Sequence, residues 1–224
     1  MPITTIVFDI GETLVDETRH WGAWADWMGV PRFTFFAAMG AVIDRGWNHR
    51  AVFQLLRPGF DVEAALVQRA AEGDRYAFEP GDFYPDAMPC LAELRRLGYC
   101  VGLAGNQPEA AEAALRAAGV GADFMASSAR WGVEKPSPAF FQRVIDAAGA
   151  AASRIAYVGD RLDNDVLPAR DIGMTAVFLR RGPWGMVHAG RPQAALAHIR
   201  LESLAELAGA LAAYHGETGV HGQD

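Results

Sequence analysis

Lysine is almost absent from this chain. Its basic side chains number 20, and all of them are arginine except Lys135. Arginine presents a planar fork of donors, whereas lysine is a compact point charge on a flexible stem. A single lysine in an arginine background indicates a position that needs the point charge, and chance is the alternative. Only the residues around Lys135 can distinguish a functional requirement from chance.

Concentrated basic segments and long apolar runs are also missing. With a formal net charge of −7 and no Lys/Arg block, the chain has no basic face for a nucleic-acid backbone. No apolar stretch approaches the roughly 18 residues of a membrane span, and because the chain opens on a strand-like run without a basic segment before it, we expect no signal peptide. The two cysteines, Cys90 and Cys100, form no metal-ligand spacing, so we interpret them as small hydrophobic residues. We expect a cytoplasmic protein that binds neither nucleic acid nor membrane; its oligomeric state stays open.

The 224 residues are 51% hydrophobic, enough for a sizeable core. Five short apolar runs fit buried parallel strands, at residues 3–8, 100–104, 124–126, 155–158 and 175–179. Helical patterns cover residues 87–97, 109–118, 138–148, 165–172 and 201–214. Glycines follow four of these at the usual C-cap position: Gly98, Gly119, Gly149 and Gly173. The alternation predicts an α/β fold with a doubly wound, Rossmann-like parallel sheet.

Residues 17–82 break the alternation, because they contain no convincing strand and many aromatic side chains. Trp21, Trp24 and Trp27 recur every third residue, which gives one apolar helix face. We interpret that face as core packing, with the roof of a ligand pocket as the alternative. We predict an inserted all-helical domain at 17–82, a core of residues 1–16 and 83–214, and a flexible tail at 215–224.

Charged side chains follow three of the predicted strands. Asp9 follows the first, Asp160 and Asp165 follow the fourth, and Lys135 follows the third. Ligands of open parallel sheets bind at the carboxyl ends of the strands, so these groups should converge. Carboxylates this close repel one another, and a divalent cation relieves the repulsion; oxygen ligands favour Mg²⁺. A helix N-cap explains one such aspartate, for example Asp163, but explains the combination poorly.

In chain order, these motifs resemble the haloacid dehalogenase-like hydrolase superfamily. The resemblance covers nearly the whole chain and rests on Asp9, the helical insert, Asn106, Lys135, and Gly159-Asp160 with Asp165 five residues after Asp160. Each motif is weak alone, and their order and placement make them specific together. The insert's position is similar to the helical cap domain of the family's dehalogenases and small-molecule phosphatases.

The resemblance implies a role for each matching residue. Asp9 would be the nucleophile, forming an aspartyl-phosphate or an aspartyl ester, and Lys135 would bridge it to the transferring group. Asp160 would bind Mg²⁺ together with Asp9, and Asp165 would be a further ligand or its support. Three contributions come from the loops: the carbonyl of Gly11 would bind the metal, the hydroxyl of Thr13 would orient its loop, and Gly105-Asn106 would contact the phosphoryl group. Separately, Arg161 follows the acidic motif and is a candidate contact for an anionic substrate, with a surface arginine as the alternative.

Two positions depart from the family pattern. Gly11 replaces a second aspartate that protonates the leaving group and activates water, an effect typically worth about 10² to 10⁴ in rate. Glu12 is the candidate substitute, against the alternative of a solvent-facing loop carboxylate, and His20 has weaker support. Gly105 replaces a Ser or Thr phosphate ligand, although backbone N–H groups of such a turn can still hold an anion.

These features favour an Mg²⁺-dependent hydrolase of a small phosphorylated metabolite. One alternative is hydrolysis at carbon, as in the family's dehalogenases, which also lack the second aspartate but need no metal. The other alternative is a catalytically weak or inactive binding protein that retains the metal site, consistent with Gly11 and Gly105. Schiff-base chemistry that needs a cap lysine is excluded, because residues 17–82 contain no lysine.

Overall fold

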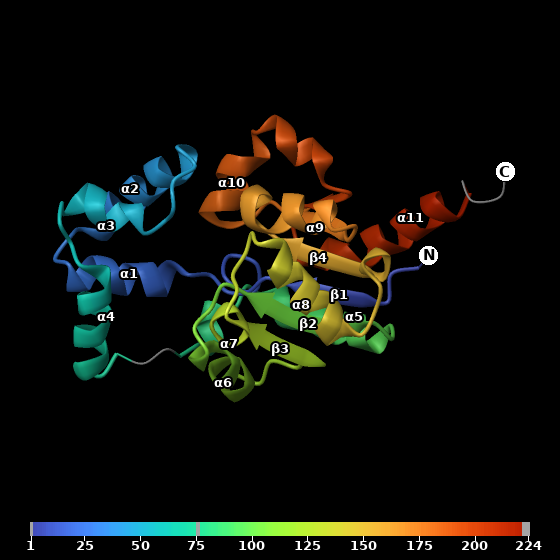
Figure 1. Cartoon of the computed structure of the whole chain (residues 1–224), viewed down its shortest axis with the longest axis horizontal. Coiled ribbons are helices and arrows are strands. Elements are labelled where there is room, and N and C mark those ends of the chain that lie inside the picture. Colours follow the sequence, from blue (N-terminus) through green and yellow to red (C-terminus); the bar gives the residue numbers. More distant parts are fainter. Residues whose placement is uncertain (1, 75–76, 221–224) are drawn as a thin grey trace. The chain divides into compact units, whose positions relative to one another are not determined.

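The computed structural model describes residues 2–74 and 77–220. It divides into two compact units: a core unit of Met1–Asp16 with Phe78–Asp224, and an inserted unit of Glu17–Ala77. Figure 1 labels the elements of both units along the chain. The inserted unit therefore ends before residue 82. The return segment belongs to the core because Asp16 N donates to Asp82 O, and Tyr84 N donates to Leu14 O.

The core unit is built on a six-stranded, wholly parallel sheet in the order β3-β2-β1-β4-β5-β6, of which Figure 1 labels β1 to β4. Its strands are β1 (Thr5–Phe8), β2 (Cys100–Gly105), β3 (Phe124–Ser127), β4 (Ile155–Gly159), β5 (Thr175–Leu179) and β6 (Ile199–Leu201). The strand order reverses between β1 and β4, and in open parallel sheets ligands bind at the carboxyl ends of the strands on either side of such a reversal. The predicted α/β fold is confirmed.

Helices cover both faces of this sheet. They are α5 (Ala87–Arg96), α6 (Ala110–Ala117), α7 (Ser128–Trp131), α8 (Pro138–Ala148), α9 (Leu167–Asp171), α10 (Gly182–Ala189) and α11 (Leu207–Val220). Alternate strand residues serve opposite faces, because strand side chains alternate. Phe8 joins the cluster that includes Leu94 of α5, whereas Val7 joins the one that includes Phe141 of α8. Burial on both faces explains the unbroken apolar runs of the strands.

The end of the chain differs from the prediction. Residues 199–201 form the edge strand β6, and the last helix begins at Leu207 and continues to Val220. Helix periodicity could not detect β6, because three residues are too few to show alternation. The first residues of the expected flexible tail are therefore helical, and residues 221–224 of that tail lie outside the described residues.

All the regular elements among the described residues of the inserted unit are helices. They are α1 (Thr18–Trp27), α2 (Arg32–Asp44), α3 (Ala51–Leu56) and α4 (Val62–Ala71). Trp24 is buried, with its ring centroid 4.8 Å from that of Phe53, whereas Trp21 and Trp27 are only partly buried. The core-packing interpretation of the tryptophan face thus holds fully for Trp24. No helix among the described residues is long and apolar enough to cross a membrane.

Candidate active site

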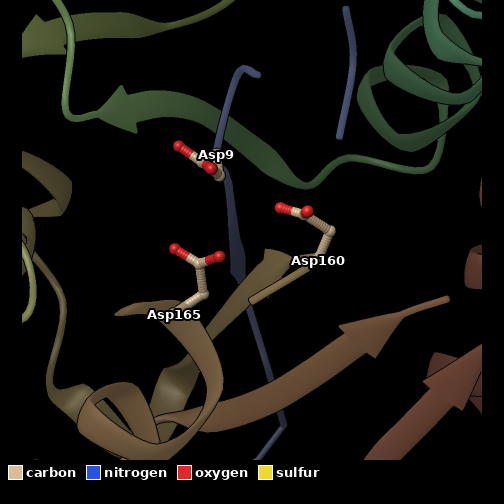
Figure 2. Close-up of side chains that lie close together, drawn as sticks. All are labelled: Asp9, Asp160 and Asp165. Carbon is tan, nitrogen blue, oxygen red and sulfur yellow. The ribbon is translucent and has the colours of Figure 1, made fainter. Parts of the chain in front are cut away.

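Three carboxylates meet at the carboxyl edge of the sheet, where the strand order reverses. Asp9 follows β1, Asp160 follows β4, and Asp165 comes from a π-helical turn, Leu162–Val166. One oxygen from each lies within 4.8 Å of the others, and all three residues are buried. Figure 2 shows the three carboxylates gathered around one space. The sequence prediction that these groups converge agrees with this geometry.

Lys135 supplies the positive charge of the cluster. Its Nζ lies 2.7 Å from Asp9 Oδ1 and 2.6 Å from Asp165 Oδ1, and the residue is 3% exposed. Burial alone would lower its pKa, but Asp165 and Asp9 raise the pKa well above the usual value. The ammonium therefore stays charged and holds two of the three carboxylates.

Asp160 is the carboxylate that Lys135 does not satisfy. Both of its oxygens are buried without a hydrogen-bond partner among the described residues. Burial raises the pKa of Asp160 well above its usual value, and Asp165 and Asp9 raise it further. Burial also raises the pKa of Asp165, to about 6, against the opposing charge of Lys135. Two orphaned oxygens beside two more carboxylates fit a hard cation such as Mg²⁺, which prefers oxygen ligands.

The backbone around β4 explains how Asp165 approaches so closely. A Cβ on Gly159 would lie 2.4 Å from Asp165 Cγ, so the last residue of this strand has to be glycine. The backbone N–H of Arg161 donates to Asp165 Oδ2 at 3.0 Å. The Gly-Asp dipeptide thus provides a ligand candidate and makes room for the next one.

The side chain of Asn106 is bonded to the loop that carries Lys135. Its Nδ2 donates to Lys135 O at 2.9 Å, and its Oδ1 accepts from Lys135 N at 2.7 Å. Both ends of the amide are therefore used to hold the backbone of Lys135. Beside it, a Cβ on Gly105 would lie 2.5 Å from Asp9 Oδ1. The Asp9 carboxylate thus occupies space that a side chain at position 105 would need.

Glu12 is buried in the core unit, which corrects the solvent-facing alternative. It is 6% exposed, and Tyr84 Oη donates to its Oε2 at 2.7 Å. Glu12 is also the only residue other than glycine with a positive φ, +53°, among the described residues. Its charge contributes to the raised pKa of Asp160, after burial, Asp165 and Asp9. The Glu12 carboxylate is therefore an inward-facing group of this site.

Thr13 and Arg161 make contacts that the sequence did not predict. The Thr13 hydroxyl is buried without a partner, so it does not orient the loop; instead, its carbonyl accepts from Arg181 Nη1 at 3.0 Å. The Arg161 guanidinium donates to Asp163 at 3.1 and 2.7 Å and lies 5.1 Å from the Trp184 ring centroid. Arg161 is therefore mostly buried and paired with Asp163, which favours neither a free surface arginine nor, by itself, a substrate contact, and the latter stays a prediction.

Several contributing residues escaped sequence reasoning. Tyr84 holds Glu12, and the Arg181 guanidinium lies 4.2 Å from the Tyr84 ring centroid and forms an ion pair with Asp86. These side chains come from segments separated along the chain, so no local pattern marks them. His20, the weaker acid–base candidate, lies on α1 of the inserted unit and is exposed as a residue; partial desolvation of its ring, with the nearby charge of Arg69, lowers its pKa to about 4.

Comparison with known proteins extends these observations. A family model described as hydrolase, haloacid dehalogenase-like hydrolase, matches residues 3–173. A glyceraldehyde 3-phosphate phosphatase of Methanopyrus kandleri is 35% identical over 153 residues, 64% of this chain and 64% of that protein. A phosphoserine phosphatase of Thermus thermophilus is 37% identical over 102 residues, 44% of this chain and 41% of that protein. The matches thus span less than two thirds of the length of these relatives.

Solved structures share the fold. A HAD-hydrolase of Bacillus subtilis bound to magnesium superposes with a TM-score of 0.69 at 16% identity, covering 94% of this chain and 99% of that one. A β-phosphoglucomutase of Clostridium difficile superposes with a TM-score of 0.68 at 16% identity, covering 97% and 99%. With the family match across residues 3–173, the chain belongs to the haloacid dehalogenase-like hydrolase family.

Proposed function

We propose that the protein is an Mg²⁺-dependent phosphatase that hydrolyses a small phosphorylated metabolite through an aspartyl-phosphate on Asp9. The carrying observation is the pairing of Asp9 with Lys135 beside Asp160, whose two oxygens are buried without partners. The named phosphatases among its relatives support phosphate-ester hydrolysis. Because those two names give different substrates, the substrate itself is left open.

The chain's own residues divide the reaction between them. An oxygen of Asp9 attacks phosphorus, the bond to the leaving oxygen breaks, and water later cleaves the acyl phosphate to release phosphate and restore Asp9. Lys135 keeps Asp9 ionised and balances charge on the phosphoryl oxygens. We assign the proton transfers to Glu12, since Gly11 has no side chain. Asp9, Asp160, Asp165 and the Gly11 carbonyl would hold Mg²⁺, which when bound neutralises charge on the phosphoryl group.

A first experiment tests the nucleophile. Phosphate release from a panel of phosphate esters, including glyceraldehyde 3-phosphate and phosphoserine, is measured with Mg²⁺ and with a chelator. Asp9→Asn should lower the rate by about 10³-fold or more, because the amide cannot attack phosphorus. Asp146→Asn, the same exchange at an exposed position of α8, is the matched control and should leave the rate unchanged.

The outcomes separate this proposal from a second candidate. Equal release from wild type and Asp9→Asn would rule out the nucleophile. Mg²⁺ binding without turnover of any ester would instead favour a binding protein, a function consistent with the missing side chain at Gly11. Mass spectrometry of the acid-quenched protein should find one phosphoryl group on the peptide that contains Asp9.

A further inference from the structure

Helix α10 follows the part of the chain matched by the family model, and it contacts both acidic loops of the site. Its first residue, Gly182, lies against Glu12. Trp184 and His188, four residues apart, face the loop after β4: the Trp184 ring meets the Arg161 guanidinium, and His188 meets the backbone of Leu162. Residues four apart share one helix face, so α10 presents a single surface to this loop.

The His188 contact is a buried hydrogen bond. Its Nδ1 accepts from the backbone N–H of Leu162 at 3.1 Å. Leu162 begins the π-helical turn, and the first N–H groups of a helix have no acceptor within it. Leu162 is buried, so water cannot readily supply the acceptor. The imidazole therefore satisfies an N–H group that lies between Asp160 and Asp165 in the chain.

The state of the imidazole agrees with this role. His188 is 2% exposed, and burial lowers its pKa to about 4, with Arg191 and Arg161 acting in the same direction and Asp163 opposing. A neutral imidazole can accept at Nδ1 only when its proton is on Nε2. The side chain is thus an acceptor for Leu162 at neutral pH, not a cation beside the acidic cluster.

We propose that His188 is a positioning residue for the cation site: by accepting the Leu162 N–H, it holds the π-helical turn that presents Asp165 beside Asp160. The proposed function supplies only the identity of the cation as Mg²⁺. His188 acts through the backbone and touches neither cation nor substrate. Outer partners that orient ligands commonly affect metal affinity by 10 to 100-fold, so the effect should be measurable.

Three substitutions separate this role from simple packing. His188→Leu fills the space but removes the acceptor. His188→Asn places Oδ1 near the position of Nδ1 and restores it, whereas His188→Gln places its oxygen one bond further out. Met186→Ala is the control on the same helix, because Met186 is 56% exposed.

The first readout is Mg²⁺ affinity of the full chain, measured by titration calorimetry after chelator treatment. We expect His188→Leu and His188→Gln to weaken binding by about tenfold or more, and His188→Asn and Met186→Ala to stay close to wild type. Wild-type affinity in His188→Leu, or equal weakening in His188→Asn and His188→Leu, would overturn the proposal. If His188→Leu does not fold, the comparison of His188→Asn with His188→Gln tests the same point. Equal Mg²⁺ affinity in these two variants would then overturn the proposal.

The second readout needs neither metal nor turnover. Exchange of the Leu162 amide hydrogen should be slow in wild type and His188→Asn and faster in His188→Leu and His188→Gln, and an unchanged rate in all four would contradict the proposal. A wild type that binds Mg²⁺ but hydrolyses no ester refutes the proposed reaction alone. A wild type that binds no Mg²⁺ overturns both the cation site and the role of His188 in it.

Discussion

Asp160 carries the clearest energetic conflict of any single residue in the core unit. Its carboxylate is buried, its oxygens lack hydrogen-bond partners among the described residues, and its neighbours Asp165 and Asp9 are acidic. Lys135 offsets the charge of the other two but does not bond Asp160. A buried unpaired charge destabilises a fold, and such groups are concentrated at functional sites of proteins. The conflict makes Asp160 a measurable reporter of the cation.

We predict that Asp160→Asn stabilises the chelator-treated protein at pH 8 and abolishes stabilisation by Mg²⁺. The raised pKa means that above it the carboxylate is ionised in both states, and burial then opposes folding. As the pH falls from that raised pKa toward 3.8, the folded state takes up the proton first, so wild type gains stability and asparagine does not. The advantage of the variant should therefore shrink as the pH falls.

Thermal unfolding of both proteins from pH 8 to pH 5, with chelator and with Mg²⁺, checks this prediction. Each difference of about 1 kcal/mol in the free energy of unfolding should shift Tm by about 2–4 °C in a chain of this size. Equal Mg²⁺ stabilisation of both proteins would contradict a cation at Asp160. A variant advantage that grows as the pH falls would contradict the raised pKa.

Helix α10 is the element whose start most affects the site. Gly182 has φ +63°, and a Cβ there would lie 2.3 Å from Glu12 Oε2 and 2.7 Å from Glu12 Cβ. Tyr84 holds the same carboxylate from the other chain segment. The placement of Glu12 thus depends on a glycine some 170 positions away in the chain, at a turn that the left-handed conformation restricts.

We predict that Gly182→Ala displaces Glu12 and lowers phosphatase activity as much as Glu12→Gln does, by about 10²-fold or more. If Glu12 protonates the leaving oxygen, both losses should be smaller for p-nitrophenyl phosphate, whose leaving group needs no proton, than for an alkyl phosphate. Gly190→Ala is the matched control at the other end of α10, where φ is −79° and the nearest atom to the new Cβ is at 3.8 Å.

Steady-state rates on the two ester types, with unfolding curves, test this prediction. Wild-type activity in Gly182→Ala would contradict the prediction, because it would show that the added Cβ does not move the Glu12 carboxylate out of its working position. Equal losses on both esters would show that Glu12 does not protonate the leaving group. A loss in Gly190→Ala would indicate that α10 itself, and not the contact with Glu12, is responsible.

At the scale of the whole molecule, one lysine in 224 residues gives a chemical probe of opening. Lys135 is buried and paired with Asp9 and Asp165, so its amine is charged and shielded. The groups around its amine come from three segments: Asp9 follows β1, Tyr157 of β4 has its ring centroid 5.6 Å from the amine, and Asp165 lies in the turn after β4. Exposure of Lys135 therefore reports separation of elements that are distant along the chain.

We predict that an amine-directed acylating reagent leaves Lys135 unmodified in the native protein and modifies it in denaturant. Mass spectrometry of the peptide around Lys135 measures both rates, and the α-amino group of the same sample serves as the internal reference. Asp9→Asn should speed the modification, because one of the two partners loses its charge. Equal modification of native and denatured protein would contradict the buried ion pair.

The sequence by itself determined the parallel sheet, the helical insert and the convergence of Asp9, Asp160, Asp165 and Lys135. These depend on local hydrophobic periodicity and on the rule that carboxyl ends of parallel strands share an edge. Asp9 and Asp160 lie directly after their strands, and Asp165 and Lys135 lie in the segments that follow, so finding the strands was enough to predict that they converge.

Tertiary structure alone decided the surroundings of that cluster. Asn106 holds Lys135, Tyr84 and Gly182 hold Glu12, and His188 holds the turn with Asp165. Each contact joins segments far apart in the chain, so it cannot be predicted from hydrophobic periodicity or from secondary-structure propensity, which are local. The edge strand β6 is similar, because β5 supplies its hydrogen-bond partner. Local sequence places a side chain on an element, but its partner is set only when the elements pack.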